Sequence, residues 1–259
     1  MTTSNISAIG PIAVITGGNR GLGKSTAQHL AAQGVDVIFT YRTNVAEASA
    51  VVAQLQAQGR RAAALQLDAG VSSGFDVFAT QLREELQRVW QRDTFDYLVN
   101  NAGHGAAASL METTEAQFDG LYNVHLKGVF FLTQKLLPMM ADGGRIVNLS
   151  TGLTRFSHPG RAAYATMKGA VETLTRYMAK ELGPRGIAVN VVAPGAIATD
   201  FGGGAVRDNP QVNSMIAAQT ALGRAGLPDD IGGAIAALLL PGNAWVTGQR
   251  IEVSGGMYL

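Results

Sequence analysis

A short glycine-rich segment between an apolar run and a helical stretch is the feature that most constrains this chain. Residues 12–16 are apolar and lead directly into Gly-Gly-Asn-Arg-Gly-Leu-Gly at residues 17–23, after which the apolar residues recur with helical spacing. Gly17 permits a tight turn, Gly21 lets another group approach the backbone, and Gly23 lets the helix pack on the strand. The order of strand, glycine turn and helix predicts a βαβ unit that opens a parallel sheet.

Strand-like runs and helical stretches alternate along the rest of the chain. Nearly continuous apolarity in such short runs indicates strands that are covered on both faces, as in a parallel sheet with crossover helices. We therefore predict an α/β fold, a single-domain Rossmann fold whose doubly wound parallel sheet has about seven strands and helices on both faces. The expected strands are residues 12–16, 35–40, 62–67, 97–100, 145–149, 187–192 and 250–253.

Length and composition indicate one domain. The 259 residues are 47% hydrophobic and 15% charged, which is ample apolar material for a sheet buried on both faces. We treat residues 1–259 as one domain, with residues 1–10 as a flexible tail. Residues from about 199 to 226 hold three consecutive glycines without a strong strand signal, and we expect a mobile substrate lid there. Gly143 and Gly144 are interpreted as a turn between elements.

Charge and cysteine usage exclude several classes of function. The net charge is +1 and the basic residues are dispersed, so we expect no nucleic-acid partner. No window approaches the roughly 18 apolar residues of a membrane span, and residues 1–10 lack a signal peptide's apolar region. We therefore expect a cytoplasmic protein without a membrane partner. The absence of cysteine excludes thiol catalysis and cysteine metal sites, and we assign no metal ligands.

The glycine-rich turn is expected to bind the pyrophosphate of a dinucleotide. A helix that begins at such a turn presents free N–H groups and a partial positive charge to an anion. An ordinary tight turn is the alternative, but the strand before it and the helix after it favour the dinucleotide. The residues assigned to this site are Gly17, Asn19, Arg20, Gly21, Leu22 and Gly23.

The end of the second expected strand distinguishes NAD from NADP. Enzymes that use NAD commonly place an acidic residue here for the ribose 2′-hydroxyl. This chain reads Phe-Thr-Tyr-Arg-Thr at residues 39–43, without an acid. Arg42 and Arg20 are suited to clamp a 2′-phosphate through charge-assisted hydrogen bonds, although solvated surface charges are the alternative interpretation. We expect NADP(H), with Tyr41, Arg42 and Thr43 near its phosphate.

Further motifs in the same order make the chain resemble the short-chain dehydrogenase/reductase family. The turn has the spacing G-x-x-x-G-x-G after a threonine, Asn-Asn-Ala-Gly stands at residues 100–103, and Tyr-x-x-x-Lys stands at residues 164–168. Pro-Gly-x-Ile-x-Thr follows the sixth expected strand, at residues 194–199. The resemblance spans nearly the whole chain and is greatest with 3-oxoacyl-[acyl-carrier-protein] reductases and related carbonyl reductases.

The resemblance implies further cofactor contacts and an assembly. The contacts would be Leu67 and Asp68 around the adenine, Asn101, Ala102 and Gly103 beside the cofactor, and Pro194, Gly195, Ile197 and Thr199 along the nicotinamide. Taken alone, the aspartate and the Asn-Asn-Ala-Gly element are also consistent with ordinary turns. Because members of the family commonly assemble through their last strand and tail, the resemblance implies a homotetramer.

Tyr164 and Lys168 carry the catalytic chemistry that the resemblance implies. They stand four residues apart in a helical stretch, residues 161–182, and therefore share one helix face. A carbonyl that receives a hydride needs a proton, which a phenol supplies as general acid and removes as general base in the reverse direction. We expect Lys168 to lower the pKa of Tyr164, aided by oxidised nicotinamide, and to hold the nicotinamide ribose.

Two positions depart from the family pattern. Thr151 stands thirteen residues before Tyr164, where the family has serine, and Ser150 precedes it. We expect Thr151 to orient the carbonyl, with Ser150 as the second choice. His125 replaces the asparagine that in the family anchors a water linking the lysine to solvent. A ring nitrogen of His125 is able to hold this water, and a purely structural helix histidine is the equally weighted alternative.

The expected activity is the reversible, NADP(H)-dependent reduction of a ketone or 3-oxo group of a small molecule to a secondary alcohol. One alternative is an NADP(H)-binding sensor or scaffold with little turnover, which the two departures motivate. A sugar or steroid alcohol dehydrogenase is another, since likeness of fold does not fix the substrate. Residues 152–160 and the lid would line the pocket, with Phe156, His158 and Phe201 as candidates.

Overall fold

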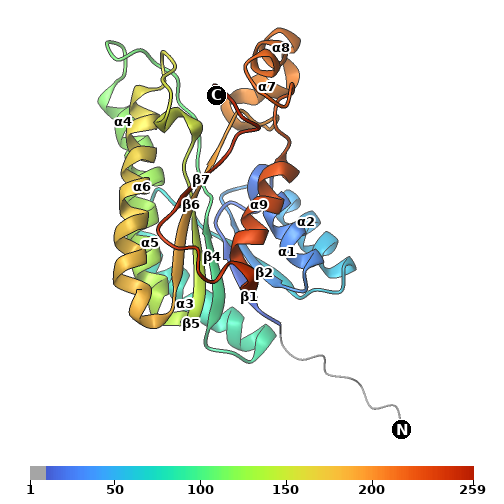
Figure 1. The fold of residues 1–259 in the computed structure, drawn as a ribbon. Coiled ribbons are helices and arrows are strands. Elements are labelled where there is room, and N and C mark those ends of the chain that lie inside the picture. Colours follow the sequence, from blue (N-terminus) through green and yellow to red (C-terminus); the bar gives the residue numbers. More distant parts are fainter. Residues whose placement is uncertain (1–9) are drawn as a thin grey trace.

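A seven-stranded parallel sheet forms the centre of the computed structural model, which describes residues 10–259 (Figure 1). The strand order is β3-β2-β1-β4-β5-β6-β7, so the sheet grows in opposite directions from β1 and β4. This order confirms the predicted doubly wound Rossmann fold. The expected tail, apart from its last residue, lies outside the described residues. The strands are β1 (Ile12–Ile15), β2 (Asp36–Tyr41), β3 (Ala62–Gln66), β4 (Phe95–Asn100), β5 (Met140–Leu149), β6 (Ala188–Pro194) and β7 (Arg250–Val253).

Helices cover both faces of the sheet (Figure 1). One face packs against α1 (Gly21–Ala32), α2 (Val45–Ala57) and α9 (Pro228–Leu239). The other carries α3 (Phe75–Glu85), α4 (Glu115–Tyr122), α5 (Gly128–Leu136) and α6 (Ala162–Leu182). The short helices α7 (Ala205–Asp208) and α8 (Pro210–Ala218) lie beyond the end of the sheet.

Strand β1 shows why its sequence is apolar at every position. Ala13 and Ile15 belong to the core under α1, α2 and α9, whereas Ile12 and Val14 belong to the core under α3, α5 and α6. All four residues are fully buried. Because side chains alternate between the two faces of a strand, a sheet covered on both sides requires an apolar residue at each position.

The interpretation of Gly143 and Gly144 as a turn between elements was wrong. Strand β5 begins at Met140 and runs through both glycines. Gly143 has a φ of +75°, and the register between β4 and β5 shifts between Phe95 and Tyr97. The two glycines therefore form an irregularity inside a strand, a place where glycine commonly occurs.

Residues 199–226, the predicted lid, are largely helical. They hold a short helical turn at Phe201–Gly204, then α7 and α8. Isolated bridges pair Ile197 with Gly226 and Thr220 with Met257, so the segment is tied to the body of the domain near its beginning and its end. Closure of this segment over a substrate stays a prediction.

Candidate active site and cofactor cleft

The predicted site residues gather at the carboxyl ends of β1, β4, β5 and β6. This edge includes the switch point between β1 and β4, where the sheet changes its direction of growth. In open α/β sheets a ligand binds in the crevice at such a point, because the loops on either side lead away in opposite directions. The topology therefore places the glycine turn after β1 next to the segment that follows β4.

The glycine turn has the backbone that its sequence predicts. Gly17 and Gly21 have φ values of +68° and +54°, a region that side chains rarely allow. A Cβ at Gly23 would lie 2.3 Å from the carbonyl oxygen of Gly17 and 2.6 Å from Nδ2 of Asn101. Gly23 thus lets the first turn of α1 close against the glycine loop itself, which leaves a compact cradle of backbone.

Asn101 braces this cradle. Its Nδ2 donates hydrogen bonds to the carbonyl oxygens of Thr16 and Gly17, at 2.8 and 3.0 Å. In return, the Thr16 hydroxyl accepts from the backbone N–H groups of Asn101 and Ala102, both at 2.9 Å. The Asn-Asn-Ala-Gly motif and the glycine motif are therefore one hydrogen-bonded unit, although more than 80 residues separate them.

Both arginines predicted for the 2′-phosphate are exposed. Arg42 directly follows β2 and forms no ion pair within residues 10–259. Arg20 is 64% exposed and lies 4.0 Å from Asp200, a distance at which the pairing is weak. Asn19 donates to Glu47 at 2.8 Å. A backbone cradle with exposed cations near it fits a dinucleotide that carries a 2′-phosphate.

The segment after β6 lies against the glycine turn, as predicted for the nicotinamide. A Cβ at Gly21 would lie 3.9 Å from the Thr199 side chain, and Thr199 is itself buried. Ile197 packs against Gly226 at the far end of the predicted lid. Gly195 lies so close to Ser254 that a Cβ would approach its Cα to 2.9 Å.

Three further predicted cofactor contacts, Leu67, Asp68 and Pro194, have surroundings that neither require nor exclude a cofactor. Leu67 is buried, and Asp68 accepts a hydrogen bond from the backbone N–H of Gly70 at 2.9 Å. Pro194 is the last residue of β6. These positions are compatible with the predicted contacts, and the roles of these residues stay predictions.

Tyr164, Lys168 and Thr151 lie buried together where β5 ends. Tyr164 and Lys168 stand on one face of α6, with Nζ of Lys168 5.8 Å from the centre of the Tyr164 ring. Nζ donates a hydrogen bond to the carbonyl oxygen of Leu149 at 2.7 Å. The hydroxyl of Thr151 interacts with the phenol of Tyr164. A proton donor, a cation and a second hydroxyl thus share one small volume.

The ionisation of this cluster differs from the expectation that Lys168 lowers the pKa of Tyr164. Burial raises the pKa of Tyr164 above its ordinary value, and the charge of Arg161 and the hydrogen bond with Thr151 offset this only in part. Burial also lowers the pKa of Lys168 to about 7. Removal of water disfavours the phenolate and the ammonium alike, so both groups tend towards their neutral forms.

His125 lies within the same cluster, on a π-helical turn (Asn123–Lys127) between α4 and α5. Its ring stands edge-on to Tyr164, with the ring centres 5.2 Å apart. Its Nε2 donates to the carbonyl oxygen of His104 at 2.7 Å, and its buried Nδ1 has no hydrogen-bond partner among the described residues. Burial, followed by the charge of Lys168, lowers the pKa of His125 to about 2. The ring is therefore neutral and offers an unpaired acceptor.

Gly103 is needed because of this histidine. A Cβ at Gly103 would lie 2.6 Å from Cε1 of His125, which is too close for any side chain. Because Gly103, the last glycine of the Asn-Asn-Ala-Gly motif, has no Cβ, the His125 ring has room to lie beside Tyr164.

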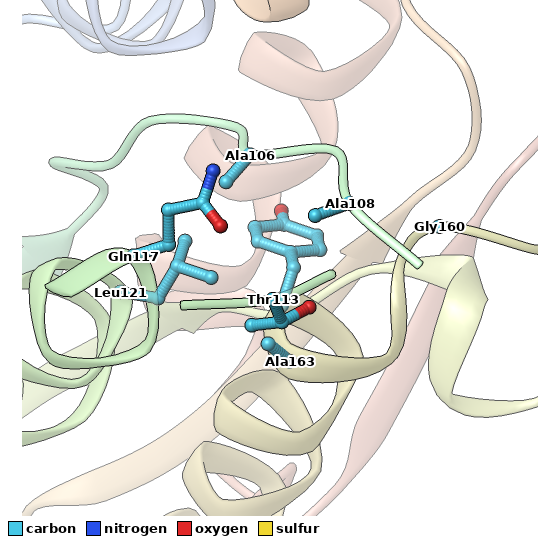
Figure 2. A pocket seen from close by; sticks show the side chains of 8 residues that line it. Ala106, Ala108, Thr113, Gln117, Leu121, Gly160 and Ala163 are labelled. Atoms are coloured by element: carbon cyan, nitrogen blue, oxygen red, sulfur yellow. The ribbon is translucent and has the colours of Figure 1, made fainter. Parts of the chain in front are cut away.

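A small hollow opens next to Tyr164 (Figure 2). Gln117 and Leu121 reach it from α4, and Ala106 and Ala108 border it from the preceding loop. The sequence interpretation did not consider residues 106–121, because no motif marks them. Thr113, Gly160 and Ala163 complete the lining.

The three residues predicted to line the substrate pocket lie in different surroundings. Phe201 reaches the site, since its ring centre lies 5.9 Å from that of Tyr164. Phe156 packs instead against Tyr258 of the C-terminal segment, at 4.6 Å between ring centres. His158 is exposed.

Comparison with known proteins supports the same interpretation. A family model described as enoyl-(acyl carrier protein) reductase matches residues 17–258. A 3-oxoacyl-[acyl-carrier-protein] reductase of Staphylococcus epidermidis is 37% identical over 249 residues, which cover 95% of this chain and 98% of that protein.

Two solved ketoreductases have the same fold over nearly their full length. The promiscuous reductase LugOII, which catalyses keto-reduction at C1 in lugdunomycin biosynthesis, has a TM-score of 0.92 and 38% identity, and the match covers 98% of this chain and 100% of that one. The angucycline C-6 ketoreductase LanV, solved with bound NADP, has a TM-score of 0.91 and 34% identity, with coverage of 96% and 95%.

Proposed function

Because this chain belongs to the short-chain dehydrogenase/reductase family of oxidoreductases, we propose that it uses NADPH to reduce a ketone or 3-oxo group to a secondary alcohol. The observation that carries this proposal is the buried cluster of Tyr164, Lys168 and Thr151 beside the glycine cradle. Relatives named for keto-reduction support a ketone as substrate, either a 3-oxoacyl thioester or one of a broader set of carbonyl compounds.

Tyr164 acts as the general acid. When bound, NADPH supplies a hydride to the carbonyl carbon. Tyr164 gives its phenolic proton to the carbonyl oxygen, so the π bond of the carbonyl breaks, a C–H and an O–H bond form, the C–O single bond remains, and a neutral alcohol leaves. The high pKa that burial gives to Tyr164 keeps the phenol protonated at neutral pH, the form that a proton donor requires.

Thr151 and Lys168 support this proton transfer. The Thr151 hydroxyl donates a hydrogen bond to the carbonyl oxygen and orients the carbonyl toward Tyr164. Lys168 would hold the nicotinamide ribose of a bound cofactor, and it returns a proton to Tyr164 after each turnover. A pKa of about 7 suits Lys168 to this second role, because it binds and releases protons readily near neutral pH.

The residues that would hold NADPH follow from the cleft. The backbone of residues 17–23 would bind the pyrophosphate, and Arg20 and Arg42 the 2′-phosphate. Asp68 would lie at the adenine, and residues 194–199 would lie along the nicotinamide.

We assign to His125 the water that in the family an asparagine anchors. Nδ1 of His125 is a buried acceptor without a partner among residues 10–259, and a buried polar atom of this kind commonly binds water. Because its pKa is about 2, His125 accepts a hydrogen bond from that water without being protonated itself.

The activity is tested by following NADPH absorbance with a panel of ketones, 3-oxoacyl thioesters and sugars. We expect oxidation of NADPH well above that of NADH, and loss of turnover in Tyr164→Phe with NADPH affinity unchanged. Tight NADPH binding without turnover on any substrate would instead support the sensor or scaffold alternative. Turnover confined to sugars would support a sugar dehydrogenase.

We also propose a cytoplasmic homotetramer. Aromatic side chains of α4, α5 and α6 are about half-exposed, which is typical of surfaces that pack against another subunit. They are Phe118, Tyr122, Phe130, Phe131 and Tyr177. The absence of cysteine fits a reducing compartment. Sedimentation equilibrium at micromolar concentration tests the assembly, and a monomer would contradict it.

None of the helices among the described residues is both long enough and apolar enough to span a membrane.

A further inference from the structure

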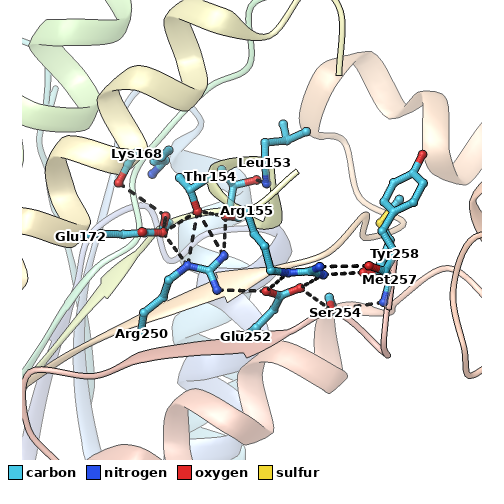
Figure 3. Close-up of polar contacts among 12 residues, drawn as sticks. Leu153, Thr154, Arg155, Lys168, Glu172, Arg250, Glu252, Ser254, Met257 and Tyr258 are labelled. Carbon is cyan, nitrogen blue, oxygen red and sulfur yellow. Dashed lines mark hydrogen bonds and ion pairs between the residues drawn. The ribbon is translucent and has the colours of Figure 1, made fainter. Parts of the chain in front are cut away.

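A network of partly buried charges lies next to Lys168 (Figure 3). Its centre is Glu172 of α6, which is 14% exposed and stands one helical turn after Lys168. Tyr164, Lys168 and Glu172 are spaced four residues apart, so all three lie along one face of α6, toward the end of β5. The mechanism described above uses the first two of these residues and leaves Glu172 without a role.

One carboxylate oxygen of Glu172 holds the segment that carries Thr151. Oε1 accepts hydrogen bonds from the hydroxyls of Ser150 and Thr154, at 2.6 and 2.7 Å. The oxygen of the Thr154 hydroxyl also lies 2.9 Å from the carbonyl oxygen of Thr151, but its single proton cannot serve both acceptors. Glu172 therefore engages the residue before Thr151 directly, and it is connected to the carbonyl of Thr151 through Arg250. Because the Ser150 hydroxyl is bound to Glu172, this geometry favours Thr151 over Ser150 as the substrate-orienting residue.

Arg250 of β7 is the cation that pairs with Glu172 in this network. Its Nε donates to Glu172 Oε1 at 2.8 Å, and a terminal nitrogen lies 3.3 Å from the carbonyl oxygen of Thr151. Its other terminal nitrogen donates to Glu252 at 2.9 Å, and Arg155 pairs with Glu252 in turn. Each carboxylate thus has a guanidinium partner, so the partly buried charges are balanced.

The effect of this network on the reactive groups is one of position. The carbonyl oxygen of Thr151 lies 3.3 Å from a terminal nitrogen of Arg250, and its side chain is close enough to Tyr164 to influence the pKa of the phenol. Lys168 is held by the carbonyl of Leu149, two residues earlier on the same segment. Any movement of this segment relative to α6 would change the distance between the Thr151 hydroxyl and Tyr164.

We propose that Glu172, acting with Arg250, is a positioning residue that fixes the Thr151 segment against α6 so that the Thr151 hydroxyl and the Tyr164 phenol meet the same carbonyl oxygen. This inference rests on the proposed ketone reduction. A misplacement of about 1 Å at a reacting centre is able to lower the rate about a hundredfold, so loosening this segment predicts a kinetic defect.

The test compares Glu172→Gln with Glu181→Gln in the full-length protein, using NADPH and whichever ketone the wild type reduces. Glu181 lies on the same helix but is exposed and has no ion pair among the described residues. We expect Glu172→Gln to lower kcat at least tenfold and to raise the KM for the ketone, with the NADPH dissociation constant unchanged. The control is expected to stay within twofold of wild type.

Arg250→Lys provides a second variant that retains the positive charge but not the planar fork of donors. We expect it to lower kcat in the same way. The kcat of the Glu172→Gln/Arg250→Lys double variant should be no lower than that of the more impaired single variant, because the two residues act as a unit. If Glu172→Gln does not fold, the Arg250→Lys variant decides by the same criteria.

Two results would overturn the proposal. One is a variant whose melting temperature falls while kcat and ketone KM stay within twofold of wild type, since this is the outcome of a purely structural role. The other is a parallel loss of NADPH affinity, which would place the effect at the cofactor. Failure of the proposed function is distinguishable, because there the wild type and Tyr164→Phe show the same rate.

Discussion

Replacement of Lys168 by methionine is expected to make the protein inactive and, at pH 6, more stable. Lys168 is 4% exposed, and methionine has a similar length without a charge. Burial lowers its pKa from 10.5 to about 7, which corresponds to a destabilisation of about 5 kcal/mol while the group is charged. The hydrogen bond to the carbonyl of Leu149 offsets about 1.5–3 kcal/mol of this and is lost with the charge. The expected gain at pH 6 is therefore about 2–3 kcal/mol.

The gain depends on pH in a direction that linkage fixes. A lysine whose folded-state pKa lies below its unfolded value destabilises the fold fully at pH values below about 7. The penalty declines as pH rises above 7 and disappears near 10.5, because between these values the unfolded chain binds the proton and the folded one does not. By pH 9 about half of the penalty is gone. The methionine variant lacks this slope, so its advantage over wild type should nearly vanish at pH 9.

Urea denaturation of both proteins at pH 6 and pH 9 measures this difference. The protein concentration is kept equal, because assembly contributes to apparent stability. If methionine destabilised the protein by the same amount at both pH values, the reasoning would be refuted. That result would mean that burial does not shift the pKa of Lys168. Loss of NADPH oxidation in the same variant separately tests the catalytic role of Lys168.

Four further predictions follow from the site. Arg42→Ala should raise the KM for NADPH at least tenfold and leave that for NADH within twofold, in steady-state assays; equal effects on both would remove Arg42 from the 2′-phosphate. Gly23→Ala puts a methyl 2.3 Å from the Gly17 carbonyl oxygen and should abolish NADPH binding in fluorescence titrations. Gly103→Ala should lower the melting temperature by several degrees, and His125→Ala should restore most of it, because the new methyl would meet the His125 ring at 2.6 Å; additive losses would contradict this. His125→Asn should leave the pH–rate profile between pH 5 and 8 unchanged, since His125 titrates near pH 2.

The parallel sheet with helices on both faces could be predicted because burial on both faces makes nearly every strand position apolar. Prediction from periodicity and turn residues fails where a glycine lies inside a strand, as at Gly143. Glycine is typical both of turns and of irregularities within strands, so the local sequence does not distinguish the two. Gly18 shows a related limit. It was assigned no role, yet a Cβ there would lie 2.5 Å from that of Phe39, a contact that only the packed fold creates.

Charge states are harder to predict than positions. The Tyr-x-x-x-Lys spacing indicates correctly that both side chains share a face of α6. The spacing does not indicate that burial raises the pKa of Tyr164 and lowers that of Lys168, so that both neutral forms are favoured. Burial depends on the segments from elsewhere in the chain that pack over the helix. Glu172 could have been found by extending the same spacing by four residues, but its partners Ser150, Thr154 and Arg250 are distant in sequence.

The burial that raises the pKa of Tyr164 has a consequence for the direction of the reaction. A protonated phenol is ready to donate, which is the requirement for reduction, whereas oxidation of an alcohol needs the phenolate. In the oxidative direction the enzyme must first remove a proton that burial holds in place, and the ammonium that would favour its loss is itself discharged above pH 7. The rate of alcohol oxidation, followed as NADPH formation, should therefore rise as pH increases above 7, because a falling proton concentration favours the phenolate.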